Sequence, residues 1–361
     1  MRKSVSIFFI LLGLALLIIS TSAHLMEEII SYRSSLNGWF GIHHSAGVGD
    51  LASMSYLDNV KRFQEKSDFN FVRPKDDTAK KNIDLYIYGD SYLETVPDSA
   101  FSSINSYHFG RRNYYDLTYS LDPHKKNILI IEIAERFARV EFELQDMFNH
   151  AKKKDTAKTS MHLSLHPLIY TRFPFFDDIF NPDINRNLEF NIFGYRFWDQ
   201  VKLTKALMTY HLFKRAVGDA VVSDDGSRLF LKQTMVNNDR ASSYYPIDQT
   251  ELQKLFVNLN AYREHYKAEG FDEVYLSIIP NPVTILQPGQ YNNLIPLLQQ
   301  QDSVKGMHII DMYSIFKKDP DPGRLFRLGD THWNFTGLQI WLNDVNDELR
   351  KQNRLGKTTI K

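Results

Sequence analysis

The sequence predicts an α/β fold with a central parallel sheet, and three observations lead to this prediction. Short apolar runs recur at wide intervals along the 361 residues, beginning with residues 83–88. Segments with helical spacing lie between several of these runs. The run at 127–133 (NILIIEI) is almost wholly apolar, which is typical of a parallel strand that is covered on both faces. Strands that alternate with helices favour one sheet with right-handed crossovers.

The remaining strands are weaker but fit the same pattern. Residues 274–279 stop at Pro280, residues 307–310 stop at Asp311, and residues 106–109 give a faint signal. We therefore expect about five strands, with helices on both faces and strand 83–88 at the centre, next to 127–133. Asp248 and Gly270 carry the start and stop signals of a helix between two of these strands.

The composition is that of a globular protein and excludes several classes. Hydrophobic residues make up 43% of the chain and charged residues 24%, which excludes a wholly disordered chain or a fibre. The basic and acidic residues number 43 each, so no global field favours nucleic acid and we expect no nucleic-acid partner. The chain has no cysteine, which excludes disulfide scaffolds, cysteine metal sites and cysteine nucleophiles.

The N-terminus predicts a membrane helix. Arg2 and Lys3 precede an uncharged apolar segment at 4–22, close to the shortest length that spans a bilayer. Basic residues before the segment keep that end in the cytoplasm, which places residues 24–361 outside it. The alternative is a cleaved signal peptide, because Thr21-Ser22-Ala23 has the small-x-small form that signal peptidase accepts. Both interpretations place the main domain in the periplasm or outside the cell.

Residues 24–82 form an N-terminal extension. Apolar residues at helical spacing from Leu51 to Phe63 predict a helix over 51–66. His43 and His44 are adjacent, so their side chains point apart and we do not expect them to bind a metal together.

Residues 137–250 interrupt the alternation and predict an insertion packed on the sheet. The segment carries two expected helices at 140–150 and 202–217, a solvated loop at 152–154, and a hairpin turn at 224–226. It also holds many aromatic residues, which we expect in a core, with a binding wall as the alternative: Phe173, Phe175, Phe176, Phe180, Phe190, Phe193, Tyr195, Phe197 and Trp198. The predicted organisation is a helix at 1–23, the extension at 24–82, one α/β domain at 83–350 with this insertion, and a tail at 351–361.

Two short segments carry the residue types of a nucleophilic triad. Gly89-Asp90-Ser91 follows the first strand, and Asp330-Thr331-His332 lies near the C-terminus. A serine hydroxyl needs a neighbouring base, and histidine serves because it titrates near neutral pH. A carboxylate then fixes the imidazole tautomer. The alternative for each segment is structural: a serine that caps the next helix, and a hydrogen-bonded loop pair.

The predicted fold can bring these segments together. Active sites of open α/β sheets form at the carboxyl ends of the strands, where Ser91 is expected. Gly89 allows a sharp turn and a close approach to the backbone. Asp330 and His332 are two residues apart, so in an extended loop both side chains face the same side. Trp333 is expected to pack beneath His332.

These motifs resemble the SGNH/GDSL hydrolase superfamily. The segment Leu328 to Asn334 (LGDTHWN) is similar to the alginate O-acetyltransferase-like branch, in which Asp-x-His-Trp recurs. Residues 278–282 (IIPNP) and 132–136 (EIAER) also resemble pieces of that branch. Ser91 precedes the Asp-x-His pair, as in ordinary SGNH enzymes. The resemblance implies a three-layer sandwich with a central parallel sheet.

Together with the N-terminal helix, the resemblance implies a membrane-anchored serine acyltransferase or esterase. This enzyme would act on O-acetyl groups of a polysaccharide through an acyl-serine, with Ser91, His332 and Asp330 as the triad. The implied partners are an acylated polysaccharide or an acyl-donor membrane protein. An inactive glycan-binding or assembly component of an exopolysaccharide system is the alternative, and a lipase or thioesterase comes third. No P-loop, dinucleotide fingerprint or metal-ligand cluster stands in the sequence, so we expect no cofactor and no metal.

The usual oxyanion Gly and Asn of SGNH enzymes have no plain match, so the oxyanion or substrate-binding candidates come from other positions. Backbone N–H groups of Ser91 or Tyr92 are candidates, and Asn105 and Asn113 are candidates for a side-chain donor. Arg136 lies just past the second strong strand, where it could stabilise an oxyanion or clamp substrate. Its alternative is a salt bridge with Glu132 or Glu135.

Overall fold

The computed structural model describes residues 2–36, 40, 49–65, 69–72, 74, 81–112, 114–142, 151–154, 184–300 and 306–355. The chain divides into two compact units. The helical unit comprises residues 1–46 and 160–215, and the sheet unit comprises residues 47–159 and 216–361. Each is described by itself below.

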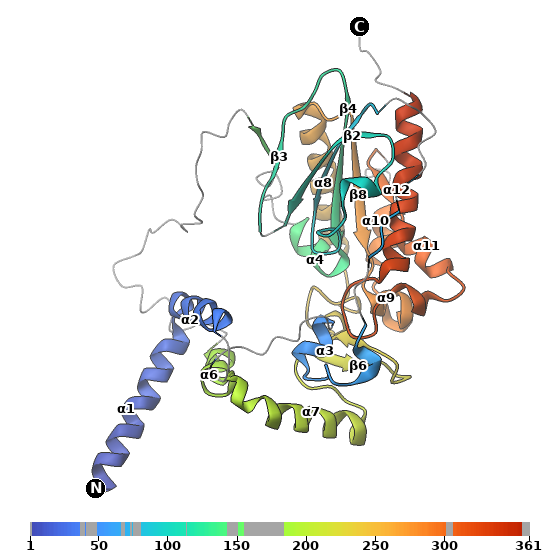
Figure 1. Ribbon diagram of the computed structural model, residues 1–361. Coiled ribbons are helices and arrows are strands. Elements are labelled where there is room, and N and C mark those ends of the chain that lie inside the picture. The colour runs from blue at the N-terminus through green and yellow to red at the C-terminus, as the bar shows by residue number, and fades with distance from the viewer. Residues whose placement is uncertain are drawn as a thin grey trace. The chain divides into compact units, whose positions relative to one another are not determined.

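The sheet unit is built on a five-stranded parallel sheet of order β2-β1-β4-β8-β9 (Figure 1). The sequence prediction of a parallel α/β sheet is confirmed, and so is the pairing of the first strand with the strand at 127–133. The expectation that strand 83–88 is central is wrong: β4 is the central strand, with β1 beside it. The five strands are β1 (Ile83–Gly89), β2 (Ile104–Arg111), β4 (Lys126–Ala134), β8 (Glu273–Ile279) and β9 (His308–Ile310).

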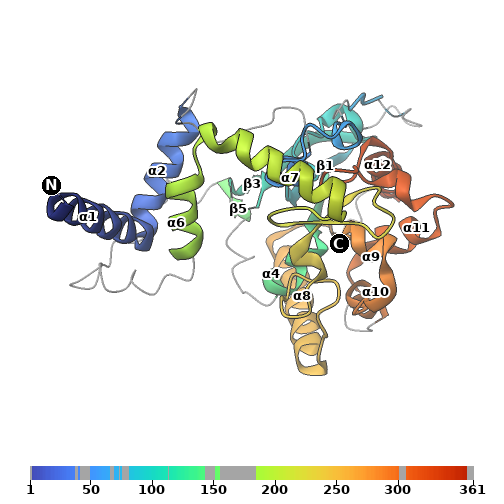
Figure 2. The same ribbon diagram turned by 90° about the horizontal axis from the view of Figure 1, so that it is seen from below.

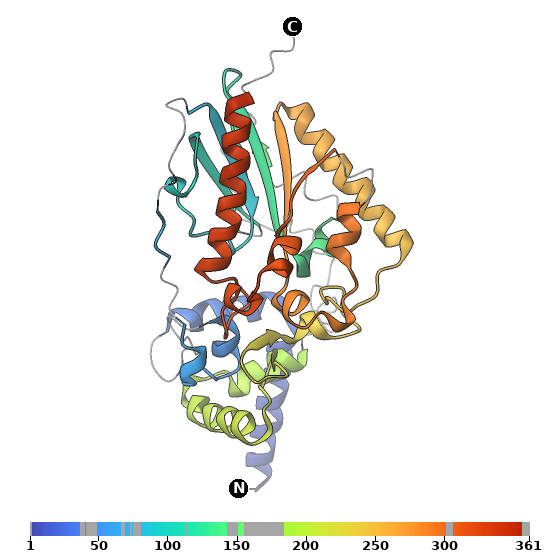
Figure 3. The ribbon, with the colours of Figure 1, turned by 90° about the vertical axis from the view of Figure 1, so that its right-hand side faces the viewer.

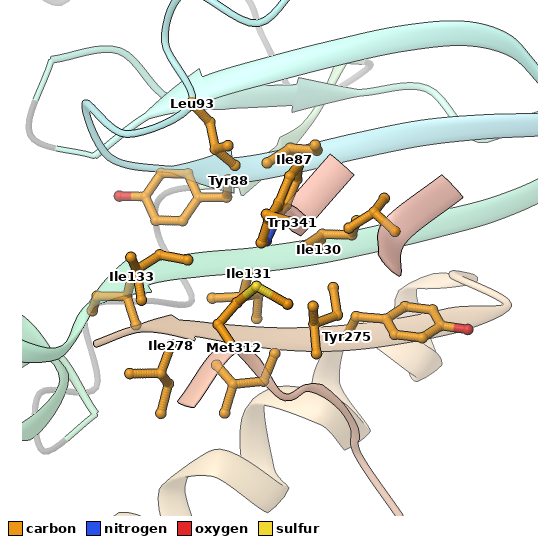
Figure 4. Close-up of a cluster of buried hydrophobic side chains, with 14 of the residues drawn as sticks. Ile87, Tyr88, Leu93, Ile130, Ile131, Ile133, Tyr275, Ile278, Met312 and Trp341 are labelled. Atoms are coloured by element: carbon orange, nitrogen blue, oxygen red, sulfur yellow. The ribbon is translucent and has the colours of Figure 1, made fainter. Parts of the chain in front are cut away.

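The apolar character of the inner strands explains why they form the core. Every residue of β1 and β4 is buried, as expected for parallel strands covered on both faces. Helices α8 (Gln249–Glu269) and α12 (Phe335–Leu355) lie on opposite sides of the sheet (Figures 1 and 2). Figure 4 shows the core between them, where Trp341 of α12 and Met312 pack against isoleucines of β1, β4 and β8.

Helix α12 runs along the sheet over most of its length (Figure 3). Two polar contacts fix it there: Trp341 Nε1 donates to Ser277 Oγ at 2.9 Å, and the Tyr275 hydroxyl bonds Glu348 at 2.8 Å. The sheet unit also contains the short helices α4 (Glu135–Glu141), α9 (Pro282–Leu286), α10 (Leu294–Gln300) and α11 (Met312–Lys318).

The predicted bounds of α8 are confirmed by its caps. The Asp248 side chain accepts from Glu251 N at 2.7 Å, and Gly270 closes the helix at φ 108°. A left-handed φ of this kind favours glycine, which explains why the helix ends there.

The expected helix at 51–66 is wrong. Helix α3 covers only Asp50–Met54, and Tyr56 then adopts a left-handed φ of 53°. Ala52 N donates to Gly329 O at 2.9 Å, so the segment docks on a distant loop. Leu51, Leu57 and Phe63 are fully buried by this docking. Tertiary burial has therefore replaced the helix that the local spacing favours.

The region 137–250 differs from the predicted insertion in several places. Ala151–Lys153 forms a strand, β5, parallel to β3 (Leu117–Tyr119), and is not a loop. The predicted hairpin is confirmed: β6 (Ala220–Val222) and β7 (Leu229–Leu231) pair antiparallel. Residues 143–150 lie outside the described residues, and so do His43, His44, Asn113 and the aromatic positions 173–180.

Residues 184–215 of that region belong to the helical unit, whereas 216–250 belong to the sheet unit. The helical unit contains α1 (Arg2–Thr21), α2 (Ala23–Ser35), α6 (Ile184–Phe193) and α7 (Asp199–Phe213). The expected helix at 202–217 is thus present with shifted bounds. Lys3–Thr21 is long and apolar enough to cross a membrane, with a mean hydropathy of 2.5, and is the one such helix among the described residues.

Candidate functional site

The three predicted triad residues lie in hydrogen-bond contact. Ser91 Oγ is 2.8 Å from His332 Nε2, although 241 positions separate them in the chain. His332 Nδ1 is in turn 2.6 Å from Asp330 Oδ1. The order hydroxyl, imidazole and carboxylate is the one that activates a serine nucleophile.

Ser91 owes its position to the turn at the end of β1. Asp90 is buried and fixes this turn, because its carboxylate accepts from Tyr92 N at 3.0 Å and from Ala134 N at 2.9 Å. Ala134 is the last residue of β4, so Asp90 ties the ends of two neighbouring strands together. Gly89 is required by space: a Cβ there would lie 2.6 Å from Glu132 Oε2.

His332 is held by its own loop. The Asp330 carboxylate accepts from the His332 backbone N–H at 3.0 Å as well as bonding the ring, so one side chain fixes both. The Tyr92 ring packs against the imidazole with centroids 4.5 Å apart. Trp333 is fully buried and meets Tyr92 edge-on, so it packs against the ring that contacts His332.

The Asp330 carboxylate is buried, whereas the His332 ring remains accessible. The Asp330 side chain is 7% exposed and that of His332 is 24% exposed. Burial opposes ionisation of Asp330, but hydrogen bonds from His332 and the nearby charge of Arg327 outweigh it. The pKa of the Asp330 carboxyl therefore lies below its ordinary value, and the group is an anion that can stabilise a protonated imidazole.

A second carboxylate, which was not predicted from the sequence, lies at this site. Asp50, the first residue of α3, accepts from Thr331 N at 2.8 Å and from Thr331 Oγ1 at 2.6 Å. Its Oδ2 lies 3.9 Å from His332 Nδ1. Burial and the charge of Asp330 raise the pKa of Asp50 above its ordinary value. The only sequence signal was that Asp50 opens a helix-like segment.

The N-terminal segment holds the same loop at two further points. Glu65 Oε2 accepts from Leu328 N at 2.9 Å, and Ala52 N bonds Gly329 O. A Cβ on Gly49 would lie 2.2 Å from Gly329 O, so the two backbones approach closely. Residues 49–65 therefore support the loop that carries Asp330 and His332.

Tyr92 is not available as the predicted backbone oxyanion donor. Its N–H already bonds Asp90, as the residue two positions after an aspartate often does in a turn. Its hydroxyl donates to Thr331 O at 2.6 Å. The side chain is buried, and it links the serine turn to the histidine loop.

Asn105 is also misplaced for an oxyanion role. Its Nδ2 donates to Asp84 Oδ1 at 2.9 Å. Ile83 pairs with Ile104, so the first residues of these parallel strands lie level. Asn105 is therefore at the amino end of the sheet, opposite the edge that carries Ser91.

Arg136 lies at the site edge of the sheet, as predicted, and is buried. Its Nη1 donates to the Tyr92 hydroxyl at 3.3 Å, and the guanidinium lies 5.6 Å from the centre of the Tyr92 ring. The two carboxylates considered as its partners have other contacts. Glu132 accepts from Asp90 N, and Glu135 accepts from Asn281 N and Thr284 Oγ1.

Asp50, Asp330 and His332 also place three potential metal-ligand atoms within 4.8 Å of one another. Each of these atoms already has a close protein partner: Nδ1 of His332 bonds Asp330, and Asp50 bonds Thr331. The arrangement therefore fits an imidazole-orienting network better than a metal centre.

Comparisons with protein-family models, curated proteins and solved structures return no match for this chain.

Proposed function

We propose that this chain is a membrane-anchored serine acyltransferase or esterase of the SGNH/GDSL type, acting outside the cytoplasm on O-acetyl groups of a polysaccharide. The observation that carries the proposal is the contact chain from Ser91 Oγ through His332 to the buried Asp330 carboxylate. The DTHW segment and its resemblance to polysaccharide acetylation proteins support the substrate class.

The geometry supports a two-step acyl transfer. His332 Nε2 removes the Ser91 proton as Oγ attacks the acyl carbon, and the ester bond to the donor breaks. The proton passes from Nε2 to the departing oxygen, which leaves an acyl-Ser91. A sugar hydroxyl then loses its proton to Nε2 and takes the acyl group, and the proton returns to Ser91. With water in place of the sugar, the same steps give hydrolysis.

Stabilisation of the oxyanion falls to fewer groups than the sequence suggested. Among the described residues, none accepts a hydrogen bond from the Ser91 N–H, whereas the Tyr92 N–H is bonded to Asp90. We assign the Ser91 N–H as one donor to the oxyanion. In this proposal Arg136 does not clamp substrate. It donates to the Tyr92 hydroxyl and so supports the contact of Tyr92 with the loop that carries His332.

The N-terminal helix is proposed to remain as an anchor and not to be cleaved. Ser20, at the end of α1, is fully buried and takes part in the folded helical unit. Asn187 Nδ2 donates to Ser20 O at 2.9 Å, and Asn191 Nδ2 donates to Ser20 Oγ at 2.9 Å. Cleavage after Ala23 would remove these contacts. A phosphatase fused to the C-terminus is expected to be active, and inactivity would contradict the topology.

The activity test uses an activated acetyl ester. The full-length protein in detergent is expected to release p-nitrophenolate from p-nitrophenyl acetate, and faster when a glycan acceptor is present if transfer is the reaction. Ser91→Ala is expected to abolish the release, whereas Ser99→Ala, at an exposed serine of the same region, leaves it unchanged. Equal rates in Ser91→Ala and wild type would refute the proposal.

One observation favours the alternative of an inactive glycan-binding or assembly component. Of the predicted oxyanion candidates, Tyr92 N–H is engaged and Asn105 lies at the opposite edge. This second function would be supported if wild type and Ser91→Ala bind acetylated polysaccharide with equal affinity and the wild type hydrolyses no ester.

A further inference from the structure

Helix α7 carries apolar side chains on two opposite faces. Ala206 and Tyr210 are buried on one face. On the other, Val201, Met208 and Leu212 are 60%, 56% and 67% exposed. These three positions are seven and four residues apart, so they form one stripe along the helix. An exposed apolar stripe on a helix indicates a surface that meets another apolar phase.

The same compact unit contains the apolar helix α1. Helix α6 contacts the end of α1 through Asn187 and Asn191, which both bond Ser20. In the proposed topology, this is the end that leaves the membrane on the outer side. Helix α6, which precedes α7 in the chain, is therefore positioned at the membrane surface.

Arg33 of α2 continues this chain of contacts toward α7. Its guanidinium donates to the carbonyl of Phe190 at 3.3 Å and also bonds that of Gly194. It lies 4.0 Å from the centre of the Tyr195 ring. Within the helical unit, Figures 1 and 3 both draw α7 across the direction of α1. A helix that runs across a membrane-spanning helix lies along the membrane surface and not through it.

The residues around the stripe have the chemistry of a membrane interface. Phe193 and Phe197 are each 45% exposed and both contact the ring of Trp198. Aromatic rings of this kind gather at the level of the lipid headgroups. Lys205 lies on the stripe itself, four residues after Val201, and its long stem allows the ammonium to reach lipid phosphates.

We propose that the exposed face of α7, formed by Val201, Met208 and Leu212, lies in the headgroup region of the membrane that α1 crosses. The occupant of this face is the lipid surface. A lysine inside an apolar stripe is compatible with anionic headgroups, whereas it would be left without compensation against a second copy of the same stripe. The inference rests on retention of α1 and is independent of the triad chemistry.

The absence of cysteine makes a direct test possible. Single variants Met208→Cys and Leu212→Cys receive an environment-sensitive fluorophore, and the full-length protein is reconstituted into vesicles of phosphatidylethanolamine and phosphatidylglycerol. The matched control is Val257→Cys, an exposed valine (58%) on α8 of the sheet unit. Quenching is measured with doxyl-labelled lipids and with aqueous iodide.

The labels on α7 are expected to be quenched severalfold more strongly by doxyl lipid than the label at Val257, and less strongly by iodide. Adding Lys205→Glu to Leu212→Cys is expected to weaken the lipid quenching in these anionic vesicles. Equal behaviour of the α7 and Val257 labels would overturn the proposal. Protection of the α7 labels from both quenchers would also overturn it, because a protein surface would then cover the stripe.

Discussion

Asp50 holds Thr331, the residue between Asp330 and the proposed catalytic base His332, at both its backbone and its side chain. The two hydrogen bonds are 2.8 Å to Thr331 N and 2.6 Å to Thr331 Oγ1, and they span 281 positions of sequence. The segment that follows the N-terminal helices thus completes the support of a loop near the C-terminus. The orientation of His332 depends on this support.

Asp50→Ala is expected to lower kcat by roughly tenfold with little change in KM, because it leaves the Thr331 N–H without its acceptor, a loss of about 1–3 kcal/mol. Asp50→Asn keeps one acceptor oxygen and is expected to cost less. Steady-state kinetics of ester hydrolysis measure both. Asp98→Ala, at an exposed position, is the control. Unchanged kcat in Asp50→Ala would show that the loop does not need this carboxylate.

The triad is expected to act as a unit. Ser91→Ala and His332→Ala should each remove most activity, and Asp330→Asn should cost a similar amount or less through loss of tautomer control. The double variant Ser91→Ala/His332→Ala should be little worse than either single variant. Rates for the four proteins, with thermal midpoints to check folding, make up the measurement. Additive losses would mean that the two residues act separately.

Glu135 is expected to make stability depend on pH. Burial outweighs its hydrogen bonds to Thr284 and Asn281 and raises the pKa of the carboxyl to about 7. The unfolded chain ionises near pH 4.3, so the folded state loses stability as pH rises toward and through 7. Glu135→Gln removes this loss. Its free energy of unfolding relative to wild type should improve by roughly 2 to 3 kcal/mol between pH 5 and pH 8.

Denaturation of the full-length protein in detergent at the two pH values measures this difference. Glu264→Gln, on the exposed side of α8, is the matched control. An identical difference between Glu135→Gln and wild type at both pH values would contradict the raised pKa.

The strands and the triad contact could be predicted because both depend on short stretches of sequence. The continuous apolar runs of β1 and β4 have few alternatives to burial between two helical layers. The same strand assignment places Ser91 at the carboxyl edge of the sheet, and the Asp330–His332 spacing needs only a local turn.

The predictions that were wrong, and the site residue that was not predicted, depend on contacts between residues far apart in the sequence. Residues 51–66 have helical spacing, yet docking against Gly329 ends the helix at Met54. The contact of Asp50 with the histidine loop could not be predicted, because its partner Thr331 lies almost at the other end of the chain. Asn105 was placed by residue type alone, and only the strand register locates it at the far edge of the sheet.

Mass spectrometry of the full-length protein, quenched in acid during turnover of p-nitrophenyl acetate, tests the central claim most directly. The proposal predicts one acetyl group on the peptide that contains Ser91, present in Ser99→Ala and absent from Ser91→Ala and His332→Ala. Turnover without any acetyl group on Ser91, or an acetyl group that persists in the Ser91→Ala protein, would contradict an acyl-serine intermediate at this site.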